Sequence, residues 1–203
     1  MRYIPSTFVI LLGLAISSAS CSKTDKTEPA VRTESATAKQ SSDPNYRYGL
    51  TVRDMNLSWK LQSESIAIKL TAKTKGWLGI GFNPEPGQDM KGANIVIGFI
   101  KDGKVEIEDH FGTLKTNHKR DEKVGGKPHI ANPAGKEEGG ATEISFTIPL
   151  NSGDALDSLI DVAKDTTVLL AYGESDAIIL KHKFRAILKV NLSTGRYSVL
   201  KVR

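Results

Sequence analysis

The sequence contains a single cysteine, Cys21, among its 203 residues. One cysteine excludes an intramolecular disulfide, a zinc cluster built from cysteine pairs, and a haem attached through a Cys-x-x-Cys-His motif. The chain also lacks the G-x-S-x-G and H-E-x-x-H motifs of common hydrolases. We therefore expect no hydrolytic site, and we expect any cofactor to be held without cysteine thioether links.

Neither sign of charge dominates, since 28 Lys and Arg residues stand against 23 Asp and Glu residues for a net charge of +5. This surplus is mild and dispersed, so no nucleic-acid partner is expected. With 39% hydrophobic and 25% charged residues, the chain has the balance of a soluble globular protein. That balance excludes a multispan membrane protein, a collagen and a wholly disordered chain.

Residues 1–20 combine Arg2, an apolar run over residues 8–16 and small residues before Cys21. This pattern predicts a secretory signal peptide that is too short to span a membrane. The cysteine after small residues resembles the lipobox of bacterial lipoproteins, in which the cysteine is lipidated. The resemblance implies a lipid-anchored protein of the bacterial cell envelope, on the outer membrane or the periplasmic face. The alternative is an ordinary signal peptide cleaved near Ala19, which would leave a free thiol.

Residues 21–44 are rich in Ser, Thr, Lys and Glu and contain no aromatic residue. Such a segment cannot bury enough apolar surface to fold, so it is predicted to be a flexible tether behind the lipidated cysteine. Residues 45–203 are long enough for one domain with a single core. We find no internal repeats.

Short segments in this domain alternate between apolar and polar residues, which is typical of half-buried β-strands. Residues 95–100 are apolar on both faces, and Asp102-Gly103 then predicts a hairpin with an interior first strand. Seven or more strands separated by turn residues predict an all-β fold, an antiparallel β-sandwich. The other expected strands lie at residues 66–73, 105–107, 144–148, 168–172, 178–192 and 197–202.

Two segments depart from this pattern. Residues 113–140 are polar, contain five glycines and two prolines, and lack periodicity, so we expect one long polar loop. That loop is either a surface insertion or a lid. Residues 155–162 predict a short helix.

His182 lies on the apolar face of the expected strand at residues 178–192, whereas Lys181 and Lys183 fall on the opposite face. The alternation therefore predicts an imidazole that points into the core. A buried imidazole needs a partner, which is either a structural hydrogen bond or a bound ligand.

Met90 lies in a turn-rich segment, residues 83–92, where strand alternation does not explain it. A methionine commonly fills a packing gap. Beside a buried histidine in an exported chain, it favours a type b haem or a copper site. Copper normally adds cysteine or more histidines, whereas haem accepts one histidine and one methionine. The other histidines, His110, His118 and His129, lie in or beside the polar loop.

An ordered series of motifs resembles the DOMON domain family over roughly residues 46–192. The series is Trp59, Gly76-Trp77-Leu78-Gly79-Ile80-Gly81-Phe82, Met90-Lys91-Gly92-Ala93-Asn94, Asp109, and Ala171-Tyr172-Gly173 followed by His182. The resemblance implies an immunoglobulin-like β-sandwich that binds haem b or sugars, as in the cytochrome domain of cellobiose dehydrogenase.

By the same resemblance, Met90 and His182 are the axial ligands of a non-covalent haem b. Trp77 and Phe82 either wall its pocket or are aromatic core residues of their strand. A cytochrome b-type domain of this kind implies electron transfer with a redox partner protein, and not a catalyst. The family often has Asp where Asn94 stands, and His or Tyr before the ligand histidine. A related haem subunit, that of ethylbenzene dehydrogenase, uses lysine opposite methionine.

That branch makes Lys181 and Lys183 rival ligands, although the alternation favours His182. Two other functions stay open from the sequence. One is a haem-free carbohydrate-binding module that uses Trp77 and Tyr172 against sugar rings. The other is a surface lipoprotein with an adhesive role.

The anchoring hypothesis predicts that Cys21→Ser releases the protein from the membrane fraction and leaves the folded domain intact, because the tether separates the two. Cell fractionation followed by thermal unfolding of the released protein measures both effects. Equal membrane retention of the variant and the parent would contradict a lipid anchor at this cysteine.

Overall fold

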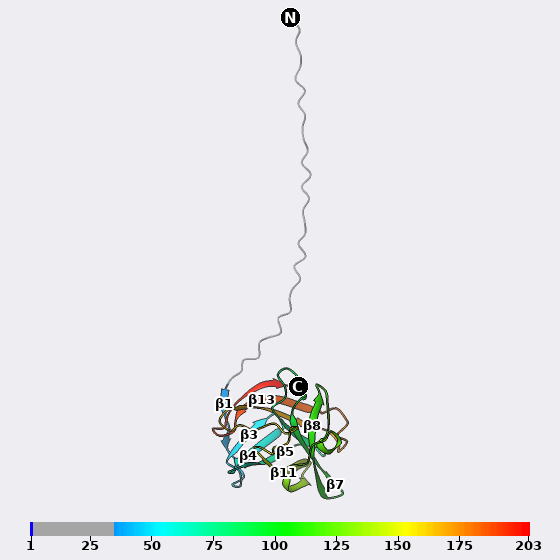
Figure 1. Ribbon diagram of the computed structural model, residues 1–203. Coiled ribbons are helices and arrows are strands. Elements are labelled where there is room, and N and C mark those ends of the chain that lie inside the picture. The colour runs from blue at the N-terminus through cyan, green and yellow to red at the C-terminus, as the bar shows by residue number, and fades with distance from the viewer. Residues whose placement is uncertain (2–34) are drawn as a thin grey trace. The chain divides into compact units, whose positions relative to one another are not determined.

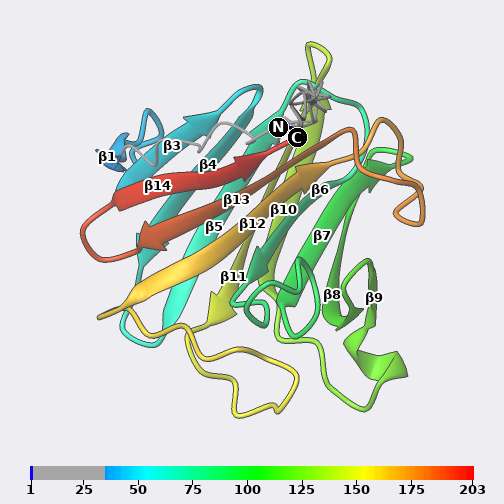
Figure 2. The same cartoon turned by 90° about the horizontal axis from the view of Figure 1, so that it is seen from above.

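The computed structural model describes Met1 and residues 35–203. Two antiparallel sheets lie one over the other, so the predicted antiparallel β-sandwich is confirmed (Figures 1 and 2). In spatial order, the eight-stranded sheet contains β1 (Ser35–Thr37), β14 (Arg196–Val202), β13 (Phe184–Asn191), β12 (Asp165–Tyr172), β6 (Leu78–Phe82), β7 (Asn94–Lys101), β8 (Lys104–Leu114) and β9 (Asn117–Arg120). The six-stranded sheet contains β10 (Ala131–Glu138), β11 (Ala141–Pro149), β5 (Ser65–Ala72), β4 (Met55–Leu61), β3 (Tyr48–Val52) and β2 (Lys39–Gln40).

The core between the sheets forms because alternate residues of each strand face inward. Strand β5 buries Ile66, Ile68 and Leu70 as the sequence predicts. On the neighbouring strand β11, Ile144 and Phe146 pair with Leu70 and Ile68 and are also buried. On the neighbouring strand β4, Trp59 pairs with Ile68, and its indole Nε1 donates to the backbone oxygen of Leu192 at 2.9 Å. This bond satisfies the one polar atom of a fully buried side chain.

The predicted hairpin between β7 and β8 is confirmed. Its two turn residues, Asp102 and Gly103, have φ values of 51° and 74°. Aspartate and glycine tolerate this left-handed conformation, which matches the twist of the strands that they join. Strand β7 is interior, with every residue except Lys101 buried.

The polar stretch at residues 113–140 is not the single long loop that we expected. It contains β9, a 3₁₀ helix at Asp121–Lys123, and β10, which pairs with β11 at the sheet edge. All eight residues of β10 are exposed, so this edge strand shows no apolar alternation in the sequence. Its backbone pairing with β11 is what holds it.

The short helix expected at residues 155–162 is absent. The carboxylate of Asp154 accepts the backbone N–H groups of Leu156 at 2.9 Å and of Lys127 at 3.0 Å. The backbone N–H of Ile160 donates to the backbone oxygen of Leu150 at 2.9 Å. In a helix the Ile160 N–H would pair with the backbone oxygen of Leu156, but here it pairs with Leu150, and the segment forms turns around the buried side chain of Ile160.

Strands β1 and β2 pair with β14 and β3, so the ordered sheets begin at Ser35, before the domain start expected at Asn45. The expected signal peptide and Cys21 lie outside the described residues, apart from Met1. None of the helices in the described part of the chain has the length and apolar character needed to cross a membrane.

The buried position of Leu70 predicts that Leu70→Ala lowers the free energy of unfolding by about 2–5 kcal/mol, because the change leaves a cavity in the core. Leu200→Ala is the matched control, since Leu200 is 41% exposed. Its expected cost is below about 1 kcal/mol. Urea unfolding measures both, and similar costs for the two variants would contradict the described core.

Candidate functional site

A second apolar cluster lies on the face of the eight-stranded sheet that is turned away from the six-stranded sheet, here called the outer face. Strand β6 carries Gly79 and Gly81 on this face, so the apolar side chains of the neighbouring strands can close over it. A Cβ atom on Gly81 would approach the side chains of Leu169 and Ile95 to 3.1 and 3.2 Å. The cluster contains Trp77, Ala93, Ile95, Ile97 and Phe99, with Met90, Leu169, Ala171 and Ile178 packed against it.

The register of the sheet places these residues in rows. Ala171 of β12 pairs with Gly79, which pairs with Ile97 of β7. One row along, Leu169 pairs with Gly81, which pairs with Ile95. Small residues therefore line the middle of the outer face, and larger apolar side chains stand around them.

Met90 reaches this cluster from the loop between β6 and β7. The backbone oxygen of Met90 accepts the N–H of Ala93 at 3.0 Å, and the N–H of Gly92 donates to the backbone oxygen of Gly112 at 2.7 Å. A Cβ atom at position 112 would lie 1.7 Å from the backbone oxygen of Met90. Glycine at this position thus allows the loop to lie against β8 with the half-buried Met90 side chain packed on the cluster.

Ion pairs tie the same loop to the far side of the outer face. The carboxylate of Asp89 lies 3.7 Å from a guanidinium nitrogen of Arg185 on β13 and 3.7 Å from the Nζ atom of Lys201 on β14. All three side chains are partly exposed, so each pair contributes little stability alone. They place two cations beside the Met90 loop.

His182 is not inside the core, contrary to the sequence prediction. Strand β13 begins at Phe184, and the inward alternation holds only from that residue onward. His182 lies half-buried in the preceding segment, while Lys181 and Lys183 are exposed as predicted. Burial lowers the pKa of His182, and the positive charge of Arg185 lowers that pKa further. The imidazole is therefore held in its neutral form, which is the form that binds metals.

A cavity of about 270 Å³ lies beside His182. Trp77 lines it, and the buried Nε1 atom of Trp77 has no hydrogen-bond partner among the described residues. Ile179 and Leu180, in the same segment as His182, are 91% and 57% exposed. The other residues that line the cavity are Gly173, Glu174, Ser175, Leu180, Lys181 and Lys183.

The structure separates the residues that the sequence grouped in one pocket. Met90 and Trp77 belong to the outer-face cluster, and His182 and Trp77 line the same cavity. Phe82 instead faces the core between the sheets and is 1% exposed, because β6 alternates and Gly81 takes the outer position. Lys183 forms an ion pair with Glu174 at 2.7 Å.

A pair of histidines adjoins the outer-face cluster on β8 and β9. The Nδ1 atoms of His110 and His118 are 3.1 Å apart, and the Nε2 atom of His110 lies 2.9 Å from a carboxylate oxygen of Glu108. Burial lowers the pKa of His118 to about 4, and burial also lowers the pKa of His110. Both rings are neutral at pH 7.

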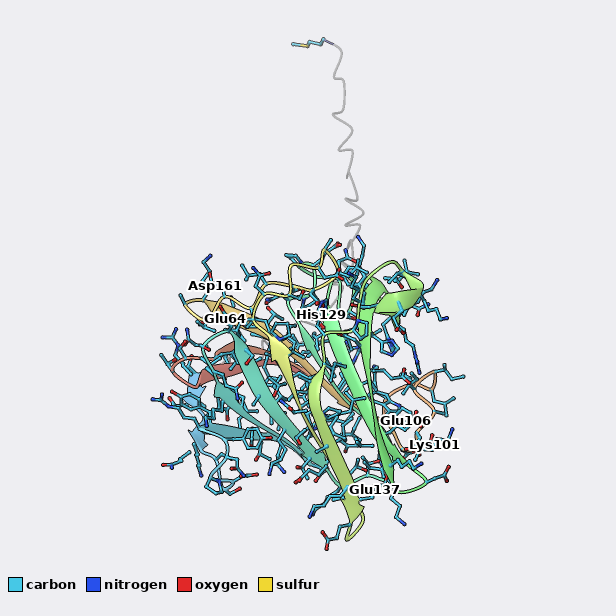
Figure 3. All side chains as sticks on the ribbon, turned by 60° about the horizontal axis from the view of Figure 1, so that its bottom comes forward. Glu64, Lys101, Glu106, His129, Glu137 and Asp161 are labelled. Carbon is cyan, nitrogen blue, oxygen red and sulfur yellow. The ribbon has the colours of Figure 1, made fainter. Side chains whose placement is uncertain are left out.

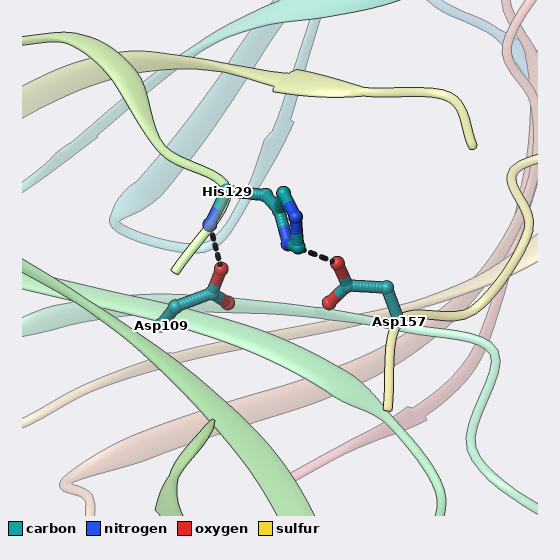
Figure 4. A group of neighbouring side chains, drawn as sticks. All are labelled: Asp109, His129 and Asp157. Carbon is teal, nitrogen blue, oxygen red and sulfur yellow. Dashed lines mark hydrogen bonds and ion pairs between the residues drawn. The ribbon is translucent and has the colours of Figure 1, made fainter. Parts of the chain in front are cut away.

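A separate polar group, which the sequence analysis missed, gathers Asp109, His129 and Asp157 (Figure 4). The backbone N–H of His129 donates to Asp109 Oδ2 at 2.8 Å, and His129 Nδ1 lies 2.8 Å from Asp157 Oδ2. The signal in the sequence was Asp109 itself, because it continues the inward-facing series of Val105 and Ile107 on β8. An aspartate on an apolar face requires a partner.

Burial raises the pKa of two carboxyl groups in this region. The pKa of Asp109 rises to about 6. The pKa of Asp121 rises to about 7, and the charges of Asp109 and Asp157 contribute to that rise after burial. Both groups therefore hold protons at a pH where ordinary carboxyl groups have lost them.

Comparisons with known proteins agree with this architecture. The family model described as the DOMON domain matches residues 52–173. DBH-like monooxygenase protein 1 from Homo sapiens is 32% identical over 123 residues, which are 60% of this chain and 19% of that protein. The Mus musculus protein of the same name is 31% identical over 121 residues, or 59% of this chain and 18% of that protein. The chain thus spans about a fifth of the length of these relatives.

Two solved structures share the fold. The cytochrome b domain of pyranose dehydrogenase from Coprinopsis cinerea matches with a TM-score of 0.51 at 10% identity, over 69% of this chain and 78% of that chain. The cytochrome domain of Myriococcum thermophilum cellobiose dehydrogenase matches with a TM-score of 0.52 at 12% identity, over 69% and 76%. At these identities the likeness is one of fold.

The raised pKa of Asp121 predicts how Asp121→Asn changes stability with pH. Between about pH 4 and pH 7 the folded parent holds a proton that the unfolded chain has lost, so this group's contribution to stability falls as pH rises, by up to about 1.4 kcal/mol per pH unit. Asparagine does not titrate, so the Asp121→Asn variant does not lose stability at this position as pH rises. Its stability relative to the parent should therefore increase from pH 5 to pH 8.

Urea unfolding of both proteins in the presence of a chelator measures this difference. The pKa values of His110 and His118 are lowered, so their contribution to stability falls as pH falls. This pH dependence is the same in the variant and the parent, so it cancels when the two free energies of unfolding are subtracted. Asp102→Asn, at the exposed hairpin turn, is the control and should show a flat difference. A flat difference for Asp121→Asn as well would contradict the raised pKa.

Proposed function

The chain belongs to the DOMON domain family, and from this premise we propose that it is an exported electron-transfer module that holds a non-covalent haem b between Met90 and His182. The observation that carries the proposal is the outer-face cluster. Met90 packs on it from one loop, and Ile178 packs on it from the segment that carries His182. One thioether and one neutral imidazole, from distant parts of the sequence, thus adjoin the same apolar surface.

The lining of the outer face and of the adjoining cavity suits an apolar group. Gly79 and Gly81 add no side chains to the middle of the face, and the apolar side chains of Leu169, Ile95, Trp77 and Ile97 lie beside them. The unpartnered Nε1 of Trp77 and the exposed side chains of Ile179 and Leu180 are costs that a bound group in the adjoining cavity would reduce. The cavity of about 270 Å³ is just below the range of about 300–1,000 Å³ that is usual for ligand pockets.

A haem b with two protein ligands exchanges single electrons. The thioether of Met90 favours the ferrous state, so a comparatively high reduction potential is expected. The lowered pKa of His182 keeps its imidazole free of a competing proton. Arg185 and Lys201 supply positive charge beside the Met90 loop, where they can pair with the carboxylates of a haem.

The comparisons support this proposal in one respect and limit it in another. Both structural neighbours are cytochrome domains, which agrees with a haem-binding module. The monooxygenase relatives are about five times longer than the matched region, so their activity is not transferred to this chain. We propose a redox partner protein and, through Cys21, attachment to a membrane of the cell envelope.

The carbohydrate-binding alternative needs exposed aromatic residues, and both of its candidates, Tyr172 and Trp77, are buried. Tyr172 is 5% exposed and stacks on Phe184 in the core, with ring centroids 5.2 Å apart. It therefore cannot stack against a sugar ring. Trp77 is also buried, with only 6% of its surface exposed.

Substitutions of the two proposed ligands should have different effects on a haem-loaded preparation of the full chain. His182→Ala should lose most of the haem, because it removes a strong nitrogen donor. Met90→Ala should keep part of the haem but become high-spin and lower its potential, because the weaker thioether is lost. Absorption spectra of the oxidised and reduced forms, with a redox titration, measure these effects.

Lys181→Gln and Lys183→Gln are the controls, because both side chains are exposed and should leave the spectrum unchanged. Loss of the low-spin spectrum in a lysine variant, with His182→Ala harmless, would mean that lysine is the ligand. Unchanged spectra in both His182→Ala and Met90→Ala would refute the proposed ligand pair.

A further inference from the structure

Asp109, His129 and Asp157 form a group that the proposed electron transfer does not use. His129 lies at one end of the sandwich, and Lys101, Glu106 and Glu137 lie toward the other end (Figure 3). One potential ligand atom from each of the three residues lies within 4.8 Å of the others. The three side chains point toward one another from β8, from the segment before β10, and from the turns before β12 (Figure 4).

Buried oxygen atoms without partners surround this group. Asp109 is 5% exposed, and its Oδ1 atom accepts no hydrogen bond from any described residue. Asn94 is 6% exposed and is directed at the group, because its Nδ2 atom donates to Asp157 Oδ1 at 2.8 Å. Its Oδ1 atom is also buried without a donor in the described part of the chain.

Asp121 adds a further carboxylate to the same region. It is 1% exposed, and neither of its side-chain oxygens has a hydrogen-bond partner within residues 35–203. A Cβ atom on Gly126 would lie 3.3 Å from Asp121 Oδ2 and 2.8 Å from the side chain of Leu156, so Asp121 lies near the segment that carries Asp157. Uncompensated burial of several carboxylates is costly, whereas a cation that accepts their lone pairs removes the cost.

We propose that Asp109, His129 and Asp157 bind a divalent cation, with the buried oxygens of Asp121 and Asn94 beside it. A set of carboxylate oxygens with one imidazole matches Mn²⁺ or Zn²⁺ better than Mg²⁺, which takes oxygen ligands and retains its waters. The His129 side chain is 27% exposed, so an ion can reach the site from solvent at this residue. The bond from Asn94 to Asp157 orients one of the ligands.

The cation would also brace the loop that carries Met90. Asn94 is the first residue of β7 and directly follows that loop. Ser158, next to Asp157, lies with its Oγ atom 3.4 Å from the backbone oxygens of Phe82 and Gly92, at the two ends of the loop. A bound ion would therefore join β8 and the turns before β12 to the base of the Met90 loop. Binding of the ion itself does not require haem.

The test uses the full chain. Bound metal is first removed with a chelator, and the chelator is then removed. Mn²⁺, Zn²⁺, Ca²⁺ and Mg²⁺ are each added alone, and thermal unfolding and titration calorimetry are measured. We expect one saturable site per chain and a rise in Tm of about 5–10 °C when the ion concentration is about 100 times Kd. We also expect release of protons on binding, because the ion replaces protons on the carboxyl groups.

Asp109→Asn and Asp157→Asn should abolish the ion-dependent rise in Tm, whereas Asp102→Asn should keep it. Comparing each variant with and without ion separates loss of binding from a general change in stability. His129→Gln should remove the preference for Mn²⁺ and Zn²⁺ over Mg²⁺. Absence of a saturable site for all four ions in the parent would overturn the proposal without any variant, as would an undiminished rise in Tm in Asp109→Asn.

Discussion

Strand β7 is buried on both faces of the eight-stranded sheet, and the arrangement of the candidate sites follows from that constraint. An antiparallel sheet commonly packs one face on the core and leaves the other in water. Here Val96 faces the core, while Ile95, Ile97 and Phe99 face outward and are also buried. The outer face therefore needs a cover. The loop before β7 and the segment before β13 supply it, and these two segments carry Met90 and His182.

The start of β7 connects the two proposed sites, although they lie on opposite faces of the sheet. Asn94 contacts Asp157 on the inner side, and Ala93, its neighbour in sequence, is bonded to the backbone oxygen of Met90. Gly112 allows the close approach that fixes this loop against β8. The Asp109 group and the Met90 loop are thus connected directly, through the adjacent residues Ala93 and Asn94.

The sequence predicted the strands whose burial alternates and missed the elements whose stability comes from pairing or from turns. Strand β5 and the β7–β8 hairpin were found because their side-chain pattern or turn residues are local signals. Strand β10 was missed because all its residues are exposed and only its backbone pairing with β11 holds it. The expected helix at residues 155–162 was wrong because the backbone oxygen of Leu150 takes the N–H of Ile160, which a helix would pair with the backbone oxygen of Leu156.

The sequence by itself determined the fold class and the faces of the regular strands, because the alternation of side chains along a strand is a local property. It also singled out Met90 as a residue that strand alternation does not explain, and His182 as an imidazole on a predicted apolar face. Only the tertiary structure decided that β13 begins after His182, that Phe82 belongs to the core, and that apolar side chains close over the glycines of β6 on the outer face. The grouping of Asp109, His129 and Asp157 was likewise settled only in three dimensions. These residues lie on three segments far apart in sequence, and strand pairing and turns bring their side chains together.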